Sequence, residues 1–342
     1  MIRRMGKPTR RDIARAAGVA ESTVSRALQD SPLITDAVKK RVRDLAVELG
    51  YVPSRQAALF ASKRTYTLGY VVPSYGSFTP FSRSYFPTLL DGLVIRADEL
   101  GYSVTIILDK VSSDTHSYLR LVHSRTVDGL LFAVTHSDGQ PFQALRDEDV
   151  PFVLINNYQD GITSVDARPV GGMRKAFDHA AALGHRSLGY VAGDEHFKNA
   201  VDRLGTFRSL ADEFGMEGAV VAGDFSRTSG YRGAEVLLSG RSRPSLIMTS
   251  SDRAAFGVIQ YAGDNGIAIP RDLSVIGYDD FYPASTSSPP LTTVSQPVLE
   301  MGKRAVSLLV DQIEGRQNDP CQEFLETDFV VRKSTAPAGG RS

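Results

Sequence analysis

Four polar side chains near the N-terminus have the types and spacing of a surface that reads DNA bases. They lie in the stretch ESTVSRAL, on the face that its apolar residues leave free: Ser22, Thr23, Ser25 and Arg26. A helix that enters the major groove carries short polar or bidentate side chains at its N-terminal end, because its axis must approach the base edges. The stretch therefore indicates a DNA-reading helix, although helix pairs of this size also occur in plain bundles.

A second group of polar and aromatic residues lies around the apolar runs of the remaining chain, mostly where strands would end. Its members are Ser74, Phe86, Asn156, Asn157, Arg203, Phe225, Ser251, Asp252, Asp279, Asp280 and Gln296. In open α/β sheets, small ligands bind beyond the carboxyl ends of the strands, and between two lobes they bind in the cleft. The group predicts such a cleft, although a lone Asp at a strand end often caps a turn and a lone Phe often packs in a core.

Three short helices would position the first group. Thr9 is placed to cap a helix in TRRDIARAAGV, with Asp12 completing a capping box and Gly18 as the stop. A second helix follows in VAESTVSRALQD, and a third runs from Thr35 to a stop at Gly50. Apolar residues at helical spacing would close a small core: Ile13, Ala14, Ala17, Val19, Val24, Leu28, Val38, Val42, Leu45 and Leu49. Two short helices joined by a glycine turn predict a helix-turn-helix.

The chain from residue 66 onward alternates short β-branched runs with amphipathic stretches. The apolar runs are TLGYVVP, YSVTIIL, DGLLFAV, FVLIN, SLGYVAG, AVVAG, SLIMTS and LSVIGYDD. This alternation predicts parallel sheets with helices on both faces. Because the segment is too long for one modest sheet, we expect two lobes joined by chain crossings near residues 155–165 and 279–296.

The neutral total charge conceals an uneven distribution. Residues 1–65 carry 14 basic and 6 acidic side chains, whereas residues 66–342 carry 25 basic and 33 acidic ones. A basic head on an acidic body is expected when one end of a chain meets a polyanion. A merely solvated basic face is the alternative reading.

Composition also bounds the compartment. The single cysteine, Cys321, excludes an intramolecular disulfide and a Cys-rich zinc site. No apolar run approaches the roughly 20 residues of a membrane span, and the basic N-terminus lacks the apolar core of a secretory signal. We expect a cytoplasmic protein that associates with the nucleoid.

The string DIARAAGVAESTVSRAL, followed by GYVPSRQAALFASKRTYTLGYVVP, resembles the N-terminal reader and hinge of the lactose-repressor/galactose-repressor (LacI/GalR) family of bacterial transcription regulators. The resemblance implies phosphate or base contacts for Thr9, Ala20, Ser25 and Arg26. It places Glu21 and Ser22 at the variable pair that selects bases. An acid there would repel phosphate unless it accepts a hydrogen bond from a cytosine amino group, so Glu21 indicates a distinct operator.

The resemblance also implies a short hinge helix after Pro53 that folds when two protomers meet on DNA. Alignment of GYVPSRQAALFASK puts Phe60 where the family inserts a leucine between base pairs in the minor groove, with Ala57 beside it. Phenylalanine can act as such a wedge. Packing of Leu59 or Phe60 against the body is the alternative.

The body resembles the family's effector domain through VDGLLF, LGHRSLGYVAG, DRLGTF, SSDRAAFGV, IPRDLSVIGYDD and SPPLTTVSQP, which occur in the expected order. The resemblance implies that Arg203 and Asp279 hydrogen-bond the effector and that Phe225 stacks on it. The further pocket positions that it implies are Phe86, Asn156, Ser251 and Gln296. This set suits a polyhydroxylated ring, because sugars offer apolar faces and paired hydroxyls. A purine-type corepressor is the alternative, since that branch also uses an aromatic, an Arg and an Asp.

Two departures from the family pattern limit this transfer. The stretch VPSYGSFTPFSRSYFPTLLDG is longer than usual, so the sequence leaves open which of Phe81, Tyr85 and Phe86 lines the pocket. Arg168 and Pro169 stand where the family usually shows Asp-Asn.

No enzyme signature accompanies these features. The sequence has no Walker A string, no GxGxxG after the first run, no HExxH and no GxSxG, and its histidines lack metal-ligand spacing. We therefore expect no catalytic residues, no metal and no cofactor.

Together the patterns predict an α/β protein with a three-helix helix-turn-helix head and a two-lobed, periplasmic-binding-protein-like body of parallel sheets. The expected domains are a DNA-binding head (1–52), a hinge (53–65), an effector-binding and dimerisation body (66–335) and a disordered tail (336–342). The predicted function is an effector-controlled repressor that binds a pseudo-palindromic operator as a homodimer, with a sugar as effector. A sugar-binding transport protein and an α/β enzyme with a DNA-binding head are the alternatives. The tail TAPAGGRS lacks leucine heptads, which favours a dimer over a tetramer.

Overall fold

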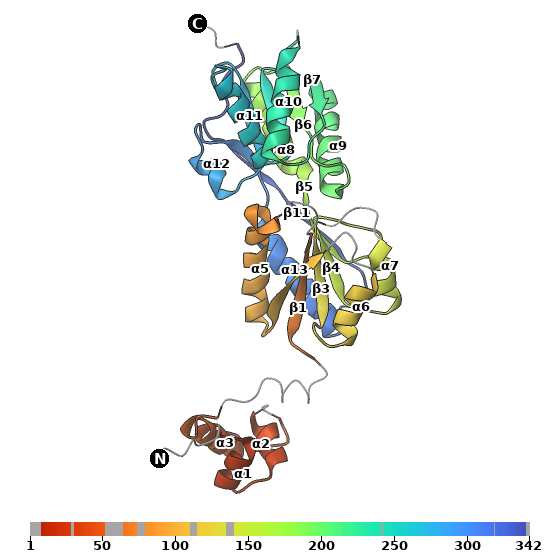
Figure 1. Ribbon diagram of the computed structural model, residues 1–342, viewed down its shortest axis with the longest axis vertical. Helices are drawn as coiled ribbons and strands as arrows, with labels where there is room; N and C mark the ends of the chain where they lie inside the picture. Colours follow the sequence, from red (N-terminus) through yellow and green to blue (C-terminus); the bar gives the residue numbers. More distant parts are fainter. Residues whose placement is uncertain are drawn as a thin grey trace. The chain divides into compact units, whose positions relative to one another are not determined.

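The structure is a computed structural model, and it describes residues 8–28, 31–51, 64–73, 79–109, 115–134, 140–240, 242–317 and 319–339 (Figure 1). The chain divides into two compact units, Met1–Thr65 and Tyr66–Ser342. The predicted hinge residues Ala57 and Phe60 lie outside the described residues, as does Ser74.

The first unit is built from α1 (Arg10–Ala17), α2 (Glu21–Leu28) and α3 (Asp36–Glu48). Its core residues are Ile13, Ala14, Ala17, Val24, Ala27, Val42 and Ala46, with Val19, Leu28, Ile34, Val38, Leu45 and Tyr51 packed against them. The prediction for Leu49 was wrong, because α3 ends one residue earlier and Leu49 is 39% exposed. Tyr51 takes the place beside the core, and its N–H donates to the Ala46 carbonyl at 2.8 Å.

Local contacts hold both ends of α1. The backbone N–H and the hydroxyl of Thr9 both donate to the Asp12 carboxylate, at 2.8 and 2.7 Å. These hydrogen bonds lower the pKa of Asp12 below its ordinary value. Gly18 ends α1 in the left-handed region with φ +67°, which glycine adopts without steric cost. The capping contacts therefore fix where α1 begins, and Gly18 fixes where it ends.

The second unit contains two six-stranded sheets. The first has the strand order β11-β5-β4-β3-β1-β2 and the second β12-β10-β9-β8-β6-β7. The strands of the first sheet are β1 (Thr67–Pro73), β2 (Ser103–Asp109), β3 (Gly129–Ala133), β4 (Phe152–Ile155), β5 (Ser164–Arg168) and β11 (Gln322–Glu326). Those of the second are β6 (Ser187–Val191), β7 (Glu217–Val221), β8 (Leu246–Thr249), β9 (Ser274–Asp279), β10 (Thr292–Ser295) and β12 (Asp328–Val330). All described neighbours pair in parallel except β12, which runs antiparallel to β10.

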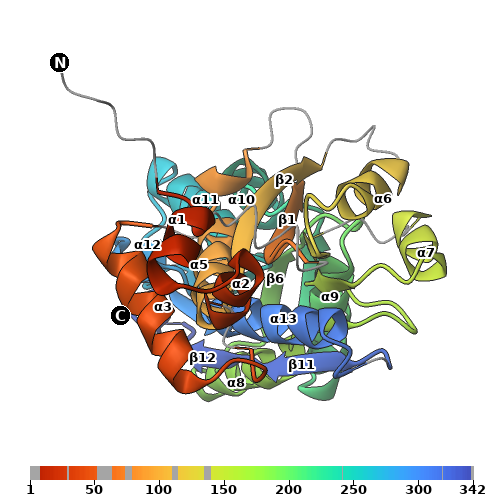
Figure 2. The ribbon, with the colours of Figure 1, turned by 90° about the horizontal axis from the view of Figure 1, so that it is seen from below.

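Helices cover both faces of each sheet, as the alternating pattern predicts (Figures 1 and 2). On the first sheet, α5 (Tyr85–Glu99) and α13 (Val298–Ile313) pack on one face, and α6 (Thr115–His123) and α7 (Gln140–Asp147) on the other. On the second, α8 (Pro169–Ala182) and α9 (Lys198–Glu213) lie opposite α10 (Arg227–Ser239) and α11 (Asp252–Asp264). The 3-10 helix η1 (Pro80–Ser82) and the short α12 (Tyr282–Thr286) complete the described elements.

The chain passes between the two lobes three times, whereas the sequence predicted two crossings. The crossings lie between β5 and α8, between β10 and α13, and between β11 and β12. The first lies later than residues 155–165, because β5 still pairs with β4 and β11 in the first sheet. Thr327 joins two crossings: its hydroxyl donates to the Arg168 carbonyl at 2.7 Å and accepts from the Gly172 N–H at 3.0 Å.

The prediction of a disordered tail was wrong for residues 336–339. The Ala336 N–H donates to the Ser274 hydroxyl at 3.0 Å, and the Ala338 N–H donates to the Leu183 carbonyl at 2.8 Å. The buried His185 ring holds the same segment, with Nε2 3.1 Å from the Ala336 carbonyl. Small side chains allow this close approach to the second lobe.

Within the described part of the chain, no helix is long and apolar enough to span a membrane.

Candidate functional site

The predicted DNA-reading residues lie on the outer side of α2 and at the start of α1. Ala20, Glu21, Ser22 and Arg26 are exposed, and Thr23 and Ser25 are half-buried. Val24 and Ala27 point into the core, so the polar face is the one left for a partner. Thr9 is exposed at the N-terminus of α1, where backbone N–H groups and the helix dipole favour a phosphate. Of the nine predicted DNA contacts, the structure describes seven and brings them to this one unit.

A cavity between the two lobes of the second unit collects the predicted effector residues. It contains about 690 Å³ of empty space, a volume that includes the open solvent at its mouth. The cavity is lined by all seven predicted effector residues: Phe86, Asn156, Arg203, Phe225, Ser251, Asp279 and Gln296. It is also lined by Tyr85, which the sequence left open, and by eight residues that the sequence did not indicate: Pro73, Arg83, Ser84, Val134, Phe197, Asn199, Arg253 and Phe281.

Arg203 lies at the centre of the polar wall. Its Nη1 donates to the Ser250 carbonyl at 2.7 Å, and its Nη2 donates to the Gln296 amide oxygen at 3.1 Å. The guanidinium carbon lies 4.0 Å from the ring centre of Tyr278 and 5.8 Å from that of Phe225. This buried cation is therefore held by two hydrogen bonds and an aromatic face, in a fixed orientation toward the cavity.

Asp279 completes this wall. The Gln296 Nε2 donates to Asp279 Oδ1 at 2.7 Å, and Arg203 Nη1 lies 3.9 Å from the same oxygen. Burial and the neighbouring Asp252 raise the pKa of Asp279 above its ordinary value, against the charge of Arg203. The carboxyl group can accordingly both accept and, when protonated, donate a hydrogen bond. This suits a ligand hydroxyl, which also both donates and accepts hydrogen bonds.

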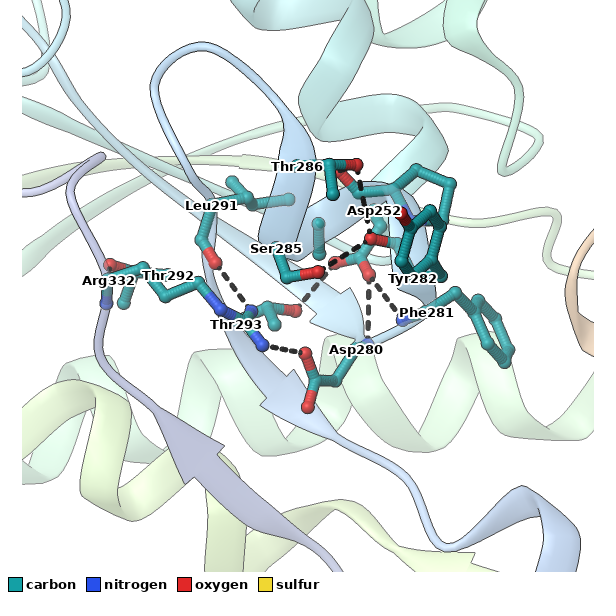
Figure 3. A network of polar contacts seen from close by, with 12 residues as sticks. Asp252, Asp280, Phe281, Tyr282, Ser285, Thr286, Leu291, Thr292, Thr293 and Arg332 are labelled. Carbon is teal, nitrogen blue, oxygen red and sulfur yellow. Dashed lines mark hydrogen bonds and ion pairs between the residues drawn. The ribbon is translucent and has the colours of Figure 1, made fainter.

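A network behind the wall fixes the end of β9 (Figure 3). The Asp252 carboxylate accepts from the Thr293 hydroxyl at 2.6 Å and from the backbone N–H groups of Asp280 and Phe281 at 2.9 and 3.2 Å. Asp280 points the other way and pairs with Arg332 at 2.6 Å. These contacts set the backbone between Asp279 and Phe281, both of which line the cavity.

Strained backbone collects around the cavity. Among the described non-glycine residues with positive φ, four line it: Val134 (50°), Asn156 (55°), Phe225 (63°) and Asp279 (134°). Side chains with a Cβ rarely adopt this region, and such residues persist where surrounding contacts fix them. Backbone strain of this kind often marks a ligand site.

Several buried polar atoms at the cavity have no hydrogen-bond partner among the described residues. Both side-chain atoms of Asn156 are unpaired, as are Asn199 Oδ1, Arg253 Nη1 and the Tyr85 hydroxyl. Asn199 and Arg203 lie four residues apart on α9, so one helix face presents both. Buried polar groups are rarely left unpaired, so these atoms are available to a polar ligand or to water.

The aromatic side is built around Phe225. Its ring centre lies 6.4 Å from that of Phe197, and the Ser251 hydroxyl donates to the Phe225 carbonyl at 3.1 Å. Gly193 leaves the space for the ring, because a Cβ at that position would overlap it. Tyr85 and Phe86 line the cavity from the first lobe, whereas Phe81 is 40% exposed and does not.

Three described members of the strand-end group do not line the cavity. The Asp252 carboxylate accepts from the backbone at Asp280, and the Asp280 carboxylate pairs with Arg332. Asn157 is buried next to Asn156 and does not line the cavity. Of the residues that the sequence did not indicate, Pro73 ends β1, Val134 follows β3 and Arg253 lies two residues after Ser251, so the strand-end rule could have included them. Asn199 lies one turn before Arg203 and could have been found by helical spacing.

These two sites, a helix-turn-helix unit and a two-lobed ligand-binding body, define an effector-responsive regulator of transcription. The family model described as "Bacterial regulatory proteins, lacI family" matches residues 9–54. The model described as "Periplasmic binding protein-like domain" matches residues 177–335. The chain is 31% identical over 342 residues to the transcriptional regulator DegA of Bacillus subtilis, covering 97% of this chain and 99% of that protein. It is 30% identical over 340 residues to CelR of Thermobifida fusca, covering 97% of this chain and 100% of that protein.

Two solved structures are similar to this chain over 96% or more of its length. The lac repressor dimer bound to operator and the anti-inducer ONPF has a TM-score of 0.83 at 25% identity, over 97% of this chain and 100% of that one. The complex of the regulator CelR with cellobiose has a TM-score of 0.72 at 30% identity, over 96% of this chain and 99% of that one. The chain belongs to the LacI family of bacterial helix-turn-helix transcription regulators. Members of this family regulate transcription and are not enzymes.

Proposed function

We propose that the protein is a repressor that binds a pseudo-palindromic operator as a homodimer and is released by a sugar-class effector in the interlobe cavity. The observation that carries the effector part is the cavity itself, in which Arg203, Asp279 and the ring of Phe225 form one wall. Charged groups beside an aromatic face suit a ring that carries hydroxyls. The relative CelR, solved with cellobiose, supports the same class of ligand.

The DNA part rests on the outward face of α2. Ser22, Thr23, Ser25 and Arg26 are short polar or bidentate groups along a short helix that would enter the major groove. Glu21 selects cytosine by accepting from its amino group, and Thr9 contacts a phosphate. Ala57 and Phe60 enter the minor groove of the operator centre, with Phe60 as the wedge. The lac repressor dimer on its operator supports this arrangement.

The homodimer part is supported by apolar side chains on the first lobe. β2 is an edge strand that exposes Ile106 and Leu108 by 43% and 50%, and α5 exposes Val94 and Ile95 by 46% and 44%. An exposed apolar edge strand is an aggregation hazard unless something covers it. A second copy of the chain covers this surface in the proposed dimer. The repressor then acts on chromosomal DNA in the cytoplasm, at the nucleoid.

The effector cavity is coupled to DNA binding through the three chain segments that join the lobes. A ligand between the lobes changes their preferred angle, and the DNA-competent state is the one that binds the effector less tightly. The operator affinity therefore falls by the ratio of the effector affinities of the two states.

The test is selection from a pool of random duplex DNA by the full-length protein, with and without a panel of sugars and nucleobases. Enrichment of a palindrome that one sugar abolishes is the expected result. A palindrome that requires a ligand would instead make the protein a corepressed switch, with purines the class to examine. No enriched sequence under any condition would contradict the proposal.

A further inference from the structure

Arginine side chains from both lobes line the interlobe cavity. Three guanidinium groups line it, from Arg83 in the first lobe and Arg203 and Arg253 in the second. Asp279 is the only carboxylate among the described lining residues. A cavity for a neutral sugar needs paired donors and acceptors rather than an excess of cations. Whether each arginine already has a partner within the protein therefore decides which class of ligand the cavity suits.

Two of the three arginines already have anionic or carbonyl partners. Arg203 is held by the Ser250 carbonyl, the Gln296 amide and the nearby Asp279. The charge of Arg83 acts on Asp224, which lies just before Phe225. Burial would raise the pKa of Asp224, but hydrogen bonds from Ser226 and Ser229 and the charge of Arg83 outweigh it and lower that pKa. Arg203 therefore has its partners within the protein, and Arg83 has an acidic neighbour in Asp224.

Arg253 is different. Its Nη1 is buried at the cavity, and no hydrogen-bond partner for it exists among the described residues. Asp252, the adjacent acid, directs its carboxylate to Thr293 and to the backbone at Asp280 and Phe281. A buried guanidinium nitrogen without an acceptor is costly, and arginine is the side chain best suited to bind a carboxylate or phosphate. Arg253 is half-buried as a whole, and its buried Nη1 is therefore available to an acceptor on a ligand.

The backbone around Arg253 favours the same ligand chemistry. Arg253 is the second residue of α11, a 13-residue helix capped by Ser251, and Ser251 also lines the cavity. The N-terminus of a helix carries partial positive charge, which favours an anion. On the opposite lobe, Asn156 is 2% exposed with both amide atoms unpaired, so it can bind ligand hydroxyls. The cavity therefore offers a cationic end and a hydroxyl-binding end.

We propose that the effector is an acidic sugar derivative, whose carboxylate or phosphate group is bound by Arg253 at the start of α11. The ring of this ligand lies against Phe225, and its hydroxyls reach Asn156 and Asn199. This inference rests on the proposed function, because it names the class of effector that the same cavity binds. Since Arg83 and Asn156 belong to one lobe and Arg253 and Asn199 to the other, such a ligand bridges the lobes.

The experiment uses matched neutral and acidic sugars with the full-length protein. Calorimetric titration and thermal unfolding at pH 7 compare D-glucose with D-glucuronate and glucose 6-phosphate, D-galactose with D-galacturonate, and inorganic phosphate alone. We expect one acidic member to bind at least tenfold more tightly than its neutral counterpart. Preference for a uronate identifies the anion as a carboxylate, and preference for the phosphate ester identifies it as a phosphate.

Two variants separate recognition of the anion from a general effect on the cavity. Arg253→Gln should weaken binding of the acidic sugar at least tenfold and change binding of the neutral sugar less than threefold. Arg271→Gln removes an exposed arginine of the same lobe that does not line the cavity, and it should change neither. Equal loss of both sugars in Arg253→Gln would overturn the inference.

The remaining outcomes distinguish this inference from the proposed function. A neutral sugar that binds as tightly as its acidic counterpart, and releases a selected operator, overturns the acidic-effector inference and leaves the repressor proposal standing. No response to any acidic sugar or to phosphate also overturns the inference. Failure to select any DNA sequence contradicts the proposed function, whatever the ligand result.

Discussion

Arg203 on α9 and Asp279 at the end of β9 approach to 3.9 Å, and the amide of Gln296 bonds to both of them. Gln296 lies in the short segment between β10 and α13, where the chain passes from the second lobe to the first. A ligand that bonds to Arg203 or Asp279 competes with this amide. The wall of the cavity and one lobe crossing therefore share a hydrogen-bond network.

Glu21 should set one base preference of the operator. In Glu21→Gln, the side chain keeps its length but gains a donor, so the preference should move from cytosine toward adenine at one position of each half-site. The change in discrimination should be about 1–3 kcal/mol at that position. Selection from random duplex DNA measures it directly.

The matched comparison for Glu21 is Arg26→Ala on the same face of α2. Loss of a phosphate or bidentate base contact should weaken binding of the selected operator by about tenfold or more. An unchanged base preference in Glu21→Gln, with normal affinity, would exclude Glu21 from base reading.

Asp166 should make folding stability depend on pH. Its carboxyl group is buried in β5, and burial raises its pKa from an ordinary 3.8 to about 7. The folded protein holds this proton more tightly than the unfolded chain, so the contribution is full below about pH 4 and decreases as the pH rises to about 7. The loss should be on the order of 4 kcal/mol.

The variant Asp166→Asn tests this directly, because an amide stays neutral and keeps an oxygen for the Ala167 N–H. Urea unfolding at pH 8 should show the variant to be more stable than the parent, and the difference should shrink toward pH 4. Asp212→Asn, an exposed change on α9, should leave the pH profile unchanged. Parallel profiles for the parent and Asp166→Asn would show that the buried carboxyl does not titrate in this range.

Asp252 should be the most costly acid to remove from the second lobe. Asp252→Ala leaves the Thr293 hydroxyl and the N–H groups of Asp280 and Phe281 without their acceptor (Figure 3). The free energy of unfolding should fall by about 3 kcal/mol. Asp264→Ala, an exposed change at the other end of α11, should lower it by less than about 0.5 kcal/mol. A similar small loss for Asp252→Ala would show that water replaces the carboxylate at the end of β9.

The sequence was sufficient for the alternating elements and for several strand-end residues of the cavity, because parallel strands place their carboxyl ends at one edge. It did not separate these from Asn157, Asp252 and Asp280, which do not line the cavity. It was not sufficient for Arg83 and Phe197, which reach the cavity from a loop and a helix start whose positions depend on tertiary packing. The third crossing was also missed. β11 and β12 are short and only partly buried, so their sequences lack the continuous apolar run that marked the inner strands.

Gly193 should control ligand binding through the ring of Phe225. A methyl group at this position would overlap the ring, which is the movable end of its side chain, so Gly193→Ala should displace the ring rather than unfold the lobe. Stacking of a sugar face on an aromatic ring depends on this position, so effector affinity should fall by tenfold or more, about 1.4 kcal/mol. Gly263→Ala on α11 meets no atom within 4 Å and is the matched control, with unchanged affinity and equal or slightly higher stability. Calorimetric titration of both variants with the selected effector measures the difference. Parental affinity in Gly193→Ala would show that Phe225 does not stack on the ligand, and the aromatic contact would then come from another lining ring: Tyr85, Phe86, Phe197 or Phe281.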